Sequence, residues 1–144
     1  MDRQDPFDLD RFVQAQEGIY EQALEELRRG RKDSHWMWFI FPQVAGLGRS
    51  MMAQAFAIGS AEEGEAYLAH PVLGVRLRQC TVAVLAHADM SAEQIFGAID
   101  AMKLRSSMTL FGALAGPASP FASSLQRFFS GEPDPATLAF LAAN

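Results

Sequence analysis

The sequence has a single cysteine, and this scarcity excludes two kinds of stabilising cross-link. Cys80 has no second cysteine in the chain for a disulfide, and no cysteine pair exists to hold a structural zinc ion. A chain of 144 residues is long enough to bury a hydrophobic core without either. Because an unpaired thiol suits a reducing compartment, the composition predicts a cytoplasmic protein.

Positive charge is also in short supply. The chain has 12 Lys and Arg against 17 Asp and Glu, which gives a net charge of −5. Affinity for nucleic acid depends on clustered cations that neutralise phosphates, so the composition argues against a nucleic-acid partner. The basic run at 28–32 is a local exception, and such a run is most often a solvated helix end.

Long apolar runs are missing as well. No uninterrupted apolar segment approaches the roughly 20 residues that a transmembrane helix needs. The N-terminus is polar and lacks the basic-then-apolar pattern of a secretory signal. The sequence therefore predicts a globular protein with no membrane partner.

Signals for a metal or a cofactor are absent too. The three histidines, His35, His70 and His87, show no metal-ligand spacing, and the carboxylates form no dense cluster beside them. Gly46 and Gly48 are too few, and no lysine follows them, to make a phosphate-binding loop. We predict neither a metal nor a cofactor.

What the sequence does contain is apolar residues at helical spacing along most of its length. The first such segment starts after Asp8, a suitable N-cap, and continues to Gly30, a suitable C-terminal stop. Ser91 and Gln94 have the spacing of a capping box at the start of a later helix. These signals predict helices and leave little room for strands.

No linker, repeat or low-complexity segment divides the chain. We therefore predict an all-α fold: residues 1–144 form a single compact orthogonal multi-helix domain of about seven or eight short helices. Residues 1–6 are expected to form a loose N-terminal tail.

The densest aromatic stretch is residues 34–43, with the sequence SHWMWFIFPQ. It contains both tryptophans, Trp36 and Trp38, and each ring of this size removes roughly 150–250 Å² from water when it is buried. We expect the rest of the chain to pack around this stretch. Within it, His35 is the histidine in the most unusual setting, and it is either a general acid or base or a structural residue that bonds a backbone carbonyl.

A second group of polar residues lies on the helix that Asp100 is predicted to open. At about 100° per residue, Asp100, Lys103 and Ser107 fall within a strip roughly 60° wide, beside the apolar stripe of Leu104 and Phe111. Two interpretations remain open. Either this edge of the core faces a cleft, or Asp100 caps the helix while the other two side chains are exposed or bonded locally.

The functional hypothesis joins the two groups in one site between the aromatic stretch and residues 100–109. In it His35 is the acid or base, Asp100 orients His35, and Lys103 stabilises negative charge. The predicted binding residues are Trp36, Trp38, Gln43, Arg105, Ser106, Ser107 and Thr109. The alternative is a non-catalytic module whose exposed aromatic surface docks a protein partner or a second copy of the chain as a homodimer. Whether the protein is an enzyme stays open.

Five segments also carry a family resemblance. They are 34–43 (SHWMWFIFPQ), 46–50 (GLGRS), 67–74 (YLAHPVLG), 103–111 (KLRSSMTLF) and 131–135 (GEPDP). Together they resemble the bacterial family of unknown function DUF1810, and the likeness covers the chain from about Phe7 onward. It implies an all-helical fold and a small cytosolic protein with no established activity. Some members carry the label calpastatin, but calpastatin is an unstructured repeat protein, unlike this aromatic-rich chain.

A weaker likeness is to the helical NADAR families. It rests on His70-Pro71-Val72-Leu73 with the following Arg76-Leu77, and it implies chemistry of NAD or ADP-ribose. The ligand that we expect between the aromatic stretch and residues 100–109 is a small molecule, of nucleotide or ADP-ribose type.

Overall fold

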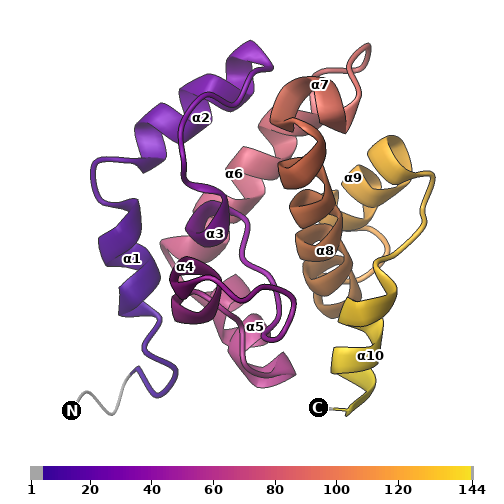
Figure 1. Cartoon of the computed structure of the whole chain (residues 1–144). Helices are drawn as coiled ribbons and strands as arrows, with labels where there is room; N and C mark the ends of the chain where they lie inside the picture. The colour runs from indigo at the N-terminus through magenta and orange to yellow at the C-terminus, as the bar shows by residue number, and fades with distance from the viewer. Residues whose placement is uncertain (1–4, 144) are drawn as a thin grey trace.

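The computed structural model describes residues 5–143, and this range holds ten helices around one core (Figure 1). The helices are α1 (Asp10–Gln16), α2 (Tyr20–Arg29), α3 (Met37–Ile40), α4 (Met51–Ala55), α5 (Ala61–Ala69), α6 (Leu73–Leu85), α7 (Ala92–Phe96), α8 (Ala98–Ala115), α9 (Pro120–Phe129) and α10 (Pro135–Ala143). The predicted all-α class is confirmed. The count exceeds the expected seven or eight, in part because the first predicted helix is two helices.

The division of that first helix falls at Gly18. α1 ends at Gln16, Gly18 adopts a left-handed φ of 73°, and α2 runs on to Gly30, whose φ of 77° ends it as predicted. The Gln16 side chain is buried at the junction, where its Nε2 donates to the carbonyl oxygen of Phe39 at 2.8 Å. At this break, the Gln16 side chain links the end of α1 to the aromatic stretch.

The predicted N-cap at Asp8 is wrong. Asp8 itself has a φ of 52°, and the carboxylate of Asp5 accepts hydrogen bonds from the backbone N–H groups of Leu9 and Asp10, at 2.7 and 3.0 Å. Asp5 thus performs the capping function from three residues earlier. Residues 1–4 of the predicted tail lie outside the described residues.

Helix α8 is the central element. It packs against α5, α7, α9 and α10 (Figure 1), and its side chains Leu104, Met108 and Phe111 are fully buried. It starts at Ala98 rather than at Asp100. Gly97 occupies the N-cap position, so Asp100 lies in the first turn and not at the cap.

The aromatic stretch is largely buried. Trp36, Phe39 and Phe41 belong to the core, and ring contacts run from Trp36 to Phe41 at 6.3 Å between centroids and from Phe41 to Phe96 at 6.0 Å. Only the four residues of α3 within the stretch are helical. A single parallel bridge between Val44 and Ile58 is the β-type pairing found within residues 5–143.

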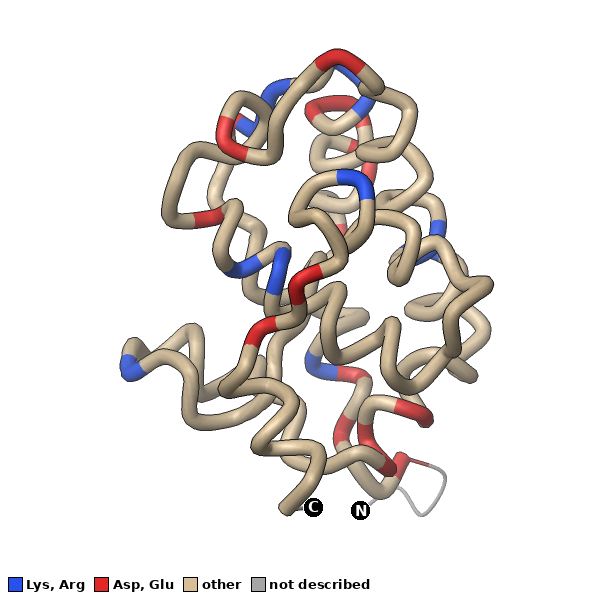
Figure 2. Tube along the Cα trace, turned by 90° about the vertical axis from the view of Figure 1, so that its right-hand side faces the viewer, with Lys and Arg blue, Asp and Glu red and all other residues tan. Residues whose placement is uncertain are grey.

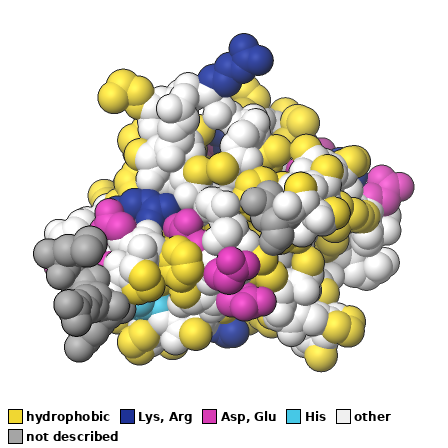
Figure 3. Space-filling model, turned by 90° about the horizontal axis from the view of Figure 1, so that it is seen from below, with side chains coloured by type: hydrophobic (Ala, Val, Ile, Leu, Met, Phe, Trp, Pro, Cys, Tyr) yellow, Lys and Arg dark blue, Asp and Glu magenta, His cyan; other side chains and the backbone are white. Residues whose placement is uncertain are grey.

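The charged residues are spread over the whole framework. Acidic residues lie at the end of the molecule near the N-terminus and also at the opposite end, and basic residues are scattered along the trace (Figure 2). From below, apolar side chains are interspersed with polar ones and acidic side chains lie near the middle of that face (Figure 3). Among the described helices, none has the length and apolar character required to cross a membrane.

Candidate functional site

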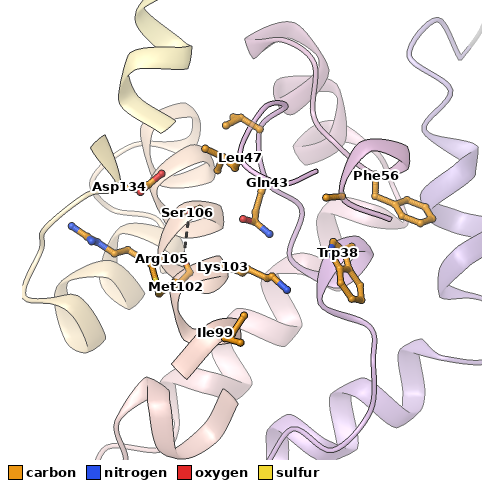
Figure 4. Close-up of a pocket in the computed structure, with 13 residues that line it drawn as sticks. Trp38, Gln43, Leu47, Phe56, Ile99, Met102, Lys103, Arg105, Ser106 and Asp134 are labelled. Atoms are coloured by element: carbon orange, nitrogen blue, oxygen red, sulfur yellow. Dashed lines mark hydrogen bonds between the residues drawn. The ribbon is translucent and has the colours of Figure 1, made fainter. Parts of the chain in front are cut away.

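Two adjoining cavities lie along the first half of α8: the segment that follows α3 lines the first, and the segment that precedes α3 lines the second. The first has a volume of about 320 Å³ and is the cavity of Figure 4; the second has a volume of about 430 Å³. Trp38, Ile99 and Lys103 line both of them. The volumes are in the range of small-molecule sites, which start at about 300 Å³. The shared residues make the two cavities parts of one recess.

Asp100 is the centre of an ionic cluster in this recess. Its two carboxylate oxygens bind different lysines: Oδ2 lies 2.8 Å from Lys32 Nζ, and Oδ1 lies 3.2 Å from Lys103 Nζ. Each lysine also lies over a tryptophan ring, since Lys32 Nζ is 5.0 Å from the centroid of Trp36 and Lys103 Nζ is 4.6 Å from that of Trp38. The cluster thereby ties the aromatic stretch to α8.

The ionisation of Asp100 follows from these contacts. Burial by itself raises the pKa of the carboxyl, but the hydrogen bond and charge of Lys32, together with those of Lys103, outweigh it, so the pKa lies below the ordinary value of 3.8. Asp100 is therefore a carboxylate at neutral pH. It acts as a fixed negative charge that holds the two ammonium groups in place.

His35 lines the second cavity together with Lys32, Asp100 and Lys103. Its side chain is exposed, and no hydrogen bond joins it to Asp100. The two oxygens of Asp100 are already bound to lysines. The structure thus brings His35, Asp100 and Lys103 to one cavity, but without the predicted contact through which Asp100 would orient the imidazole.

The two tryptophans do not form the predicted stacking wall. Trp36 is fully buried, and its indole N–H donates to the carboxylate of Glu26 at 3.0 Å, so its ring is closed to a ligand in this structure. Trp38 is half-buried and borders both cavities, with Lys103 over one face of its ring. The aromatic contribution to the recess comes from Trp38 and, in the first cavity, from Phe56.

Gln43, Arg105 and Ser106 line the first cavity (Figure 4). Arg105 extends toward the loop between α9 and α10, where it donates to the backbone carbonyls of Glu132 and Pro133 at 2.9 and 2.8 Å. The Ser106 hydroxyl donates back to a carbonyl of its own helix. The Gln43 amide points into the cavity and makes no hydrogen bond to any described residue.

Ser107 and Thr109 lie outside both cavities. The two side chains are buried, and the Ser107 hydroxyl has no hydrogen-bond partner within residues 5–143. Thr109 Oγ1 donates to the carbonyl of Arg105 at 2.8 Å and accepts from the backbone N–H of Asp134 at 2.9 Å. Thr109 therefore holds the start of α10 against α8 and is a supporting residue of the site.

The sequence reasoning missed two residues that shape the site. Lys32 belongs to the basic run interpreted as a solvated helix end, yet its side chain is only 7% exposed. Glu26 follows a row of exposed acids on α2 but is buried, and it accepts from the backbone N–H groups of Asp33 and Ser34 and from Trp36. The burial of Glu26 could have been predicted from its position next to the inward-facing Leu27. The local sequence around Lys32 contains no signal that its side chain is buried.

The hydrogen bonds to Glu26 alter its ionisation. Burial raises the pKa of the carboxyl, but the hydrogen bonds from the Ser34 hydroxyl, from the N–H groups of Asp33 and Ser34 and from Trp36 outweigh burial and lower the pKa from 4.5 to about 2. Glu26 is thus a buried carboxylate with its oxygens satisfied. It fixes the loop from Asp33 to Trp36, which carries His35.

The described residues offer no group of three or more His, Cys, Asp or Glu side chains arranged to bind a metal ion. The carboxylates of the recess are each engaged by protein groups. Asp100 binds two lysines, and Asp134 Oδ2 accepts from the backbone N–H and the hydroxyl of Thr137 at the start of α10, at 3.0 and 2.6 Å.

Comparison with known proteins identifies the family. Residues 6–141 match the model of the family described as "Protein of unknown function (DUF1810)". A solved structure, that of the conserved hypothetical protein Rv1873 from Mycobacterium tuberculosis, is 48% identical and superposes with a TM-score of 0.93 over 97% of this chain and 100% of that chain. No curated protein matches the chain significantly. The chain belongs to the DUF1810 family, whose function is unknown.

Proposed function

We propose that the recess between Trp38 and α8 binds a small organic anion of nucleotide type. The observation that carries the proposal is the position of Lys103. Its ammonium group borders both cavities, and it is held there by Asp100 and by the ring of Trp38. A cation fixed at the junction of two cavities is suited to bind a negatively charged group of a ligand that extends into both.

The charge of the recess supports an anionic ligand. The cavity linings include three cationic side chains, Lys32, Lys103 and Arg105, against two carboxylates, Asp100 and Asp134. The chain as a whole has the opposite balance, with 12 cationic and 17 acidic residues. A locally positive recess in an acidic protein attracts anions and disfavours cations.

The rest of the first cavity supports an apolar part in the ligand. Leu47, Phe56, Ile99 and Met102 contribute hydrocarbon and ring surface to its walls. Ligand sites typically combine such walls with a small number of polar groups that set orientation. We assign the apolar part of the ligand to the first cavity, and its anionic group to Lys103, with His35 available to a polar group in the second cavity.

The test is binding of nucleotides to the wild type and to the Lys103→Ala variant. Thermal shift and titration calorimetry with adenosine 5′-monophosphate and ADP-ribose are expected to give binding by the wild type. A hydrogen bond to a charged group contributes about 1.5–3 kcal/mol, so removal of the ammonium should weaken binding about ten- to hundredfold.

Arg29→Ala is the matched control, because it also removes one positive charge but lies on α2, outside both cavities. Its affinity should equal that of the wild type. If Lys103→Ala and Arg29→Ala bind the nucleotides equally well, or if the wild type binds none of them, the proposed site is wrong.

A second candidate function, self-association, is favoured by the rim of the first cavity. Ile99 and Met102 line this cavity and are 74% and 71% exposed, and the neighbouring α4 exposes Met51 and Met52. Large apolar side chains grouped at a surface are typical of protein interfaces. The occupant of this rim would be a second copy of the chain.

Sedimentation measurements over a range of concentrations test this candidate. If the rim is an interface, the wild type should sediment as a dimer and Met102→Asp as a monomer, because a carboxylate would be buried in the interface without a partner. Val82→Asp, at an exposed position of α6 that lines neither cavity, should leave the dimer intact. A monomeric wild type throughout the range would eliminate self-association.

A further inference from the structure

Gln43 differs from the other polar side chains that line the first cavity. Lys103 binds Asp100, Arg105 binds two backbone carbonyls, Ser106 binds the carbonyl of Met102, and Asp134 binds Thr137. The amide of Gln43 has no partner among residues 5–143 and points into the cavity (Figure 4). Its hydrogen-bonding capacity is therefore available to a ligand.

The backbone that carries this amide is fixed. The carbonyl of Gln43 accepts from the N–H of Ile58 at 2.8 Å, and the N–H of Ala45 donates to the carbonyl of Ile58 at 2.9 Å. These bonds flank the bridge between Val44 and Ile58, two buried residues. Because the main chain is held on both sides of the bridge, the starting point of the Gln43 side chain does not shift when a ligand enters.

A primary amide presents one acceptor oxygen and one donor nitrogen side by side. It pairs best with a ligand edge that has a donor next to an acceptor, as glutamine does with the amino group and ring nitrogen of adenine. The surrounding walls of Leu47, Phe56 and Met102 are apolar and suit the faces of a ring. A sugar or a plain carboxylate would match the amide but leave these walls without a contact.

We propose that Gln43 is a specificity-determining residue that pairs with the amino and ring-nitrogen edge of an aminopurine, so that the ligand of this recess is an adenine nucleotide. This inference rests on the proposed function, since it assigns the base to the first cavity and the phosphate to Lys103. It adds which base is selected and which side chain selects it.

The experiment compares three probes by titration calorimetry. Adenosine 5′-monophosphate has the complete edge, purine riboside 5′-monophosphate lacks only the exocyclic amine, and ribose 5-phosphate lacks the base. The wild type should bind adenosine 5′-monophosphate at least tenfold more tightly than purine riboside 5′-monophosphate, because with the latter the Gln43 oxygen has no donor to pair with. The third should bind more weakly again.

The variants assign this preference to Gln43. Gln43→Met keeps the length of the side chain but has no amide, and it should bind adenosine 5′-monophosphate and purine riboside 5′-monophosphate equally. Gln43→Glu keeps the size and an acceptor for the amine but has no donor for the ring nitrogen, so it should bind both nucleotides more weakly than the wild type and keep the preference for the amine. Circular dichroism and melting temperature establish that each variant is folded, and each gives its own test: the preference in Gln43→Met and the affinity for adenosine 5′-monophosphate in Gln43→Glu.

The outcomes separate the two proposals. If the wild type binds both purine nucleotides with equal affinity, or binds ribose 5-phosphate as tightly as either, the role of Gln43 is wrong while the anion site stands. The same holds if the preference survives in Gln43→Met, or if Gln43→Glu binds adenosine 5′-monophosphate as tightly as the wild type does. If the wild type binds none of the three probes, the proposed function fails together with the inference.

Discussion

Replacing Glu26 with alanine is expected to lower the free energy of unfolding by about 3 kcal/mol or more. The buried carboxylate accepts from the N–H groups of Asp33 and Ser34, from the Ser34 hydroxyl and from the indole of Trp36. A buried donor that loses its partner costs about 1–3 kcal/mol, and alanine leaves the buried indole N–H of Trp36 and three partly buried donors without a partner at once. Urea denaturation at neutral pH measures the loss.

The same carboxylate is expected to make stability depend on acid pH. Its pKa is lowered from 4.5 to about 2 in the folded protein, so the folded state binds the proton less readily than the unfolded state does. The stabilisation is fully present above about pH 4.5, falls as the pH decreases, and is lost once the pH passes below about 2. The shift corresponds to about 3 kcal/mol.

Glu26→Gln is the matched variant for this dependence, because it keeps the shape of the side chain and cannot titrate. Between pH 4.5 and about 2 its stability should fall less steeply than that of the wild type. Asp100, whose pKa is also lowered, is present in both proteins and contributes equally to both curves. Parallel curves for the two proteins would show that Glu26 does not titrate as we expect.

Replacing Gly74 with alanine is expected to lower the free energy of unfolding by about 3 kcal/mol. A β-carbon at this position, in the first turn of α6, would overlap the backbone carbonyl of Leu68 at the end of α5. Backbone cannot move aside as a flexible side chain does, so the two helices would separate, at the upper end of the roughly 1–3 kcal/mol typical of overpacking. Arg78, which donates to the carbonyls of Leu68 and Gly74, would lose its geometry.

Gly112→Ala provides the control, with the opposite sign expected. Gly112 lies within α8, and an added β-carbon would meet its nearest atom, the backbone nitrogen of Ala122, at 3.4 Å, which is ordinary contact. Alanine is preferred over glycine inside a helix by about 1 kcal/mol, so this variant should be slightly more stable. Thermal denaturation of the two variants side by side makes the comparison. Equal destabilisation by both would refute the assigned contact at Gly74.

The effect of losing Glu26 bears on the candidate site because this carboxylate holds the loop that carries His35. This loop lies on one side of the second cavity. Lys32, just before that loop, forms an ion pair with Asp100 on α8. Thr109 ties the start of α10, where Asp134 borders the first cavity, to the same helix. The recess is therefore supported from α2, α8 and α10.

The sequence predicts helix ends best where the capping residue bonds backbone groups that are close to it in the chain. The capping box of Ser91 and Gln94 is present in full, and the left-handed Gly30 ends α2 as expected. The predicted cap at Asp8 is wrong because a second aspartate, Asp5, is close enough in sequence to bond the same backbone N–H groups, and the pattern does not say which of the two does so. The break at Gly18 was not predicted, because the inward-facing apolar residues keep their helical spacing on both sides of it.

The sequence alone established the all-α class, the local helix signals and membership of the DUF1810 family, because these depend on short-range hydrogen bonds, apolar periodicity and shared motifs. It also brought residues 34–43 and 100–109 together as one hypothesis. Which of their side chains border a cavity depended on the three-dimensional packing: Trp36 and Ser107 are buried, Lys32 reaches Asp100, and the Gln43 amide is left without a partner. Whether a side chain is buried, and which group it bonds, depends on contacts between segments that are far apart in the chain, so neither can be predicted from the local sequence pattern.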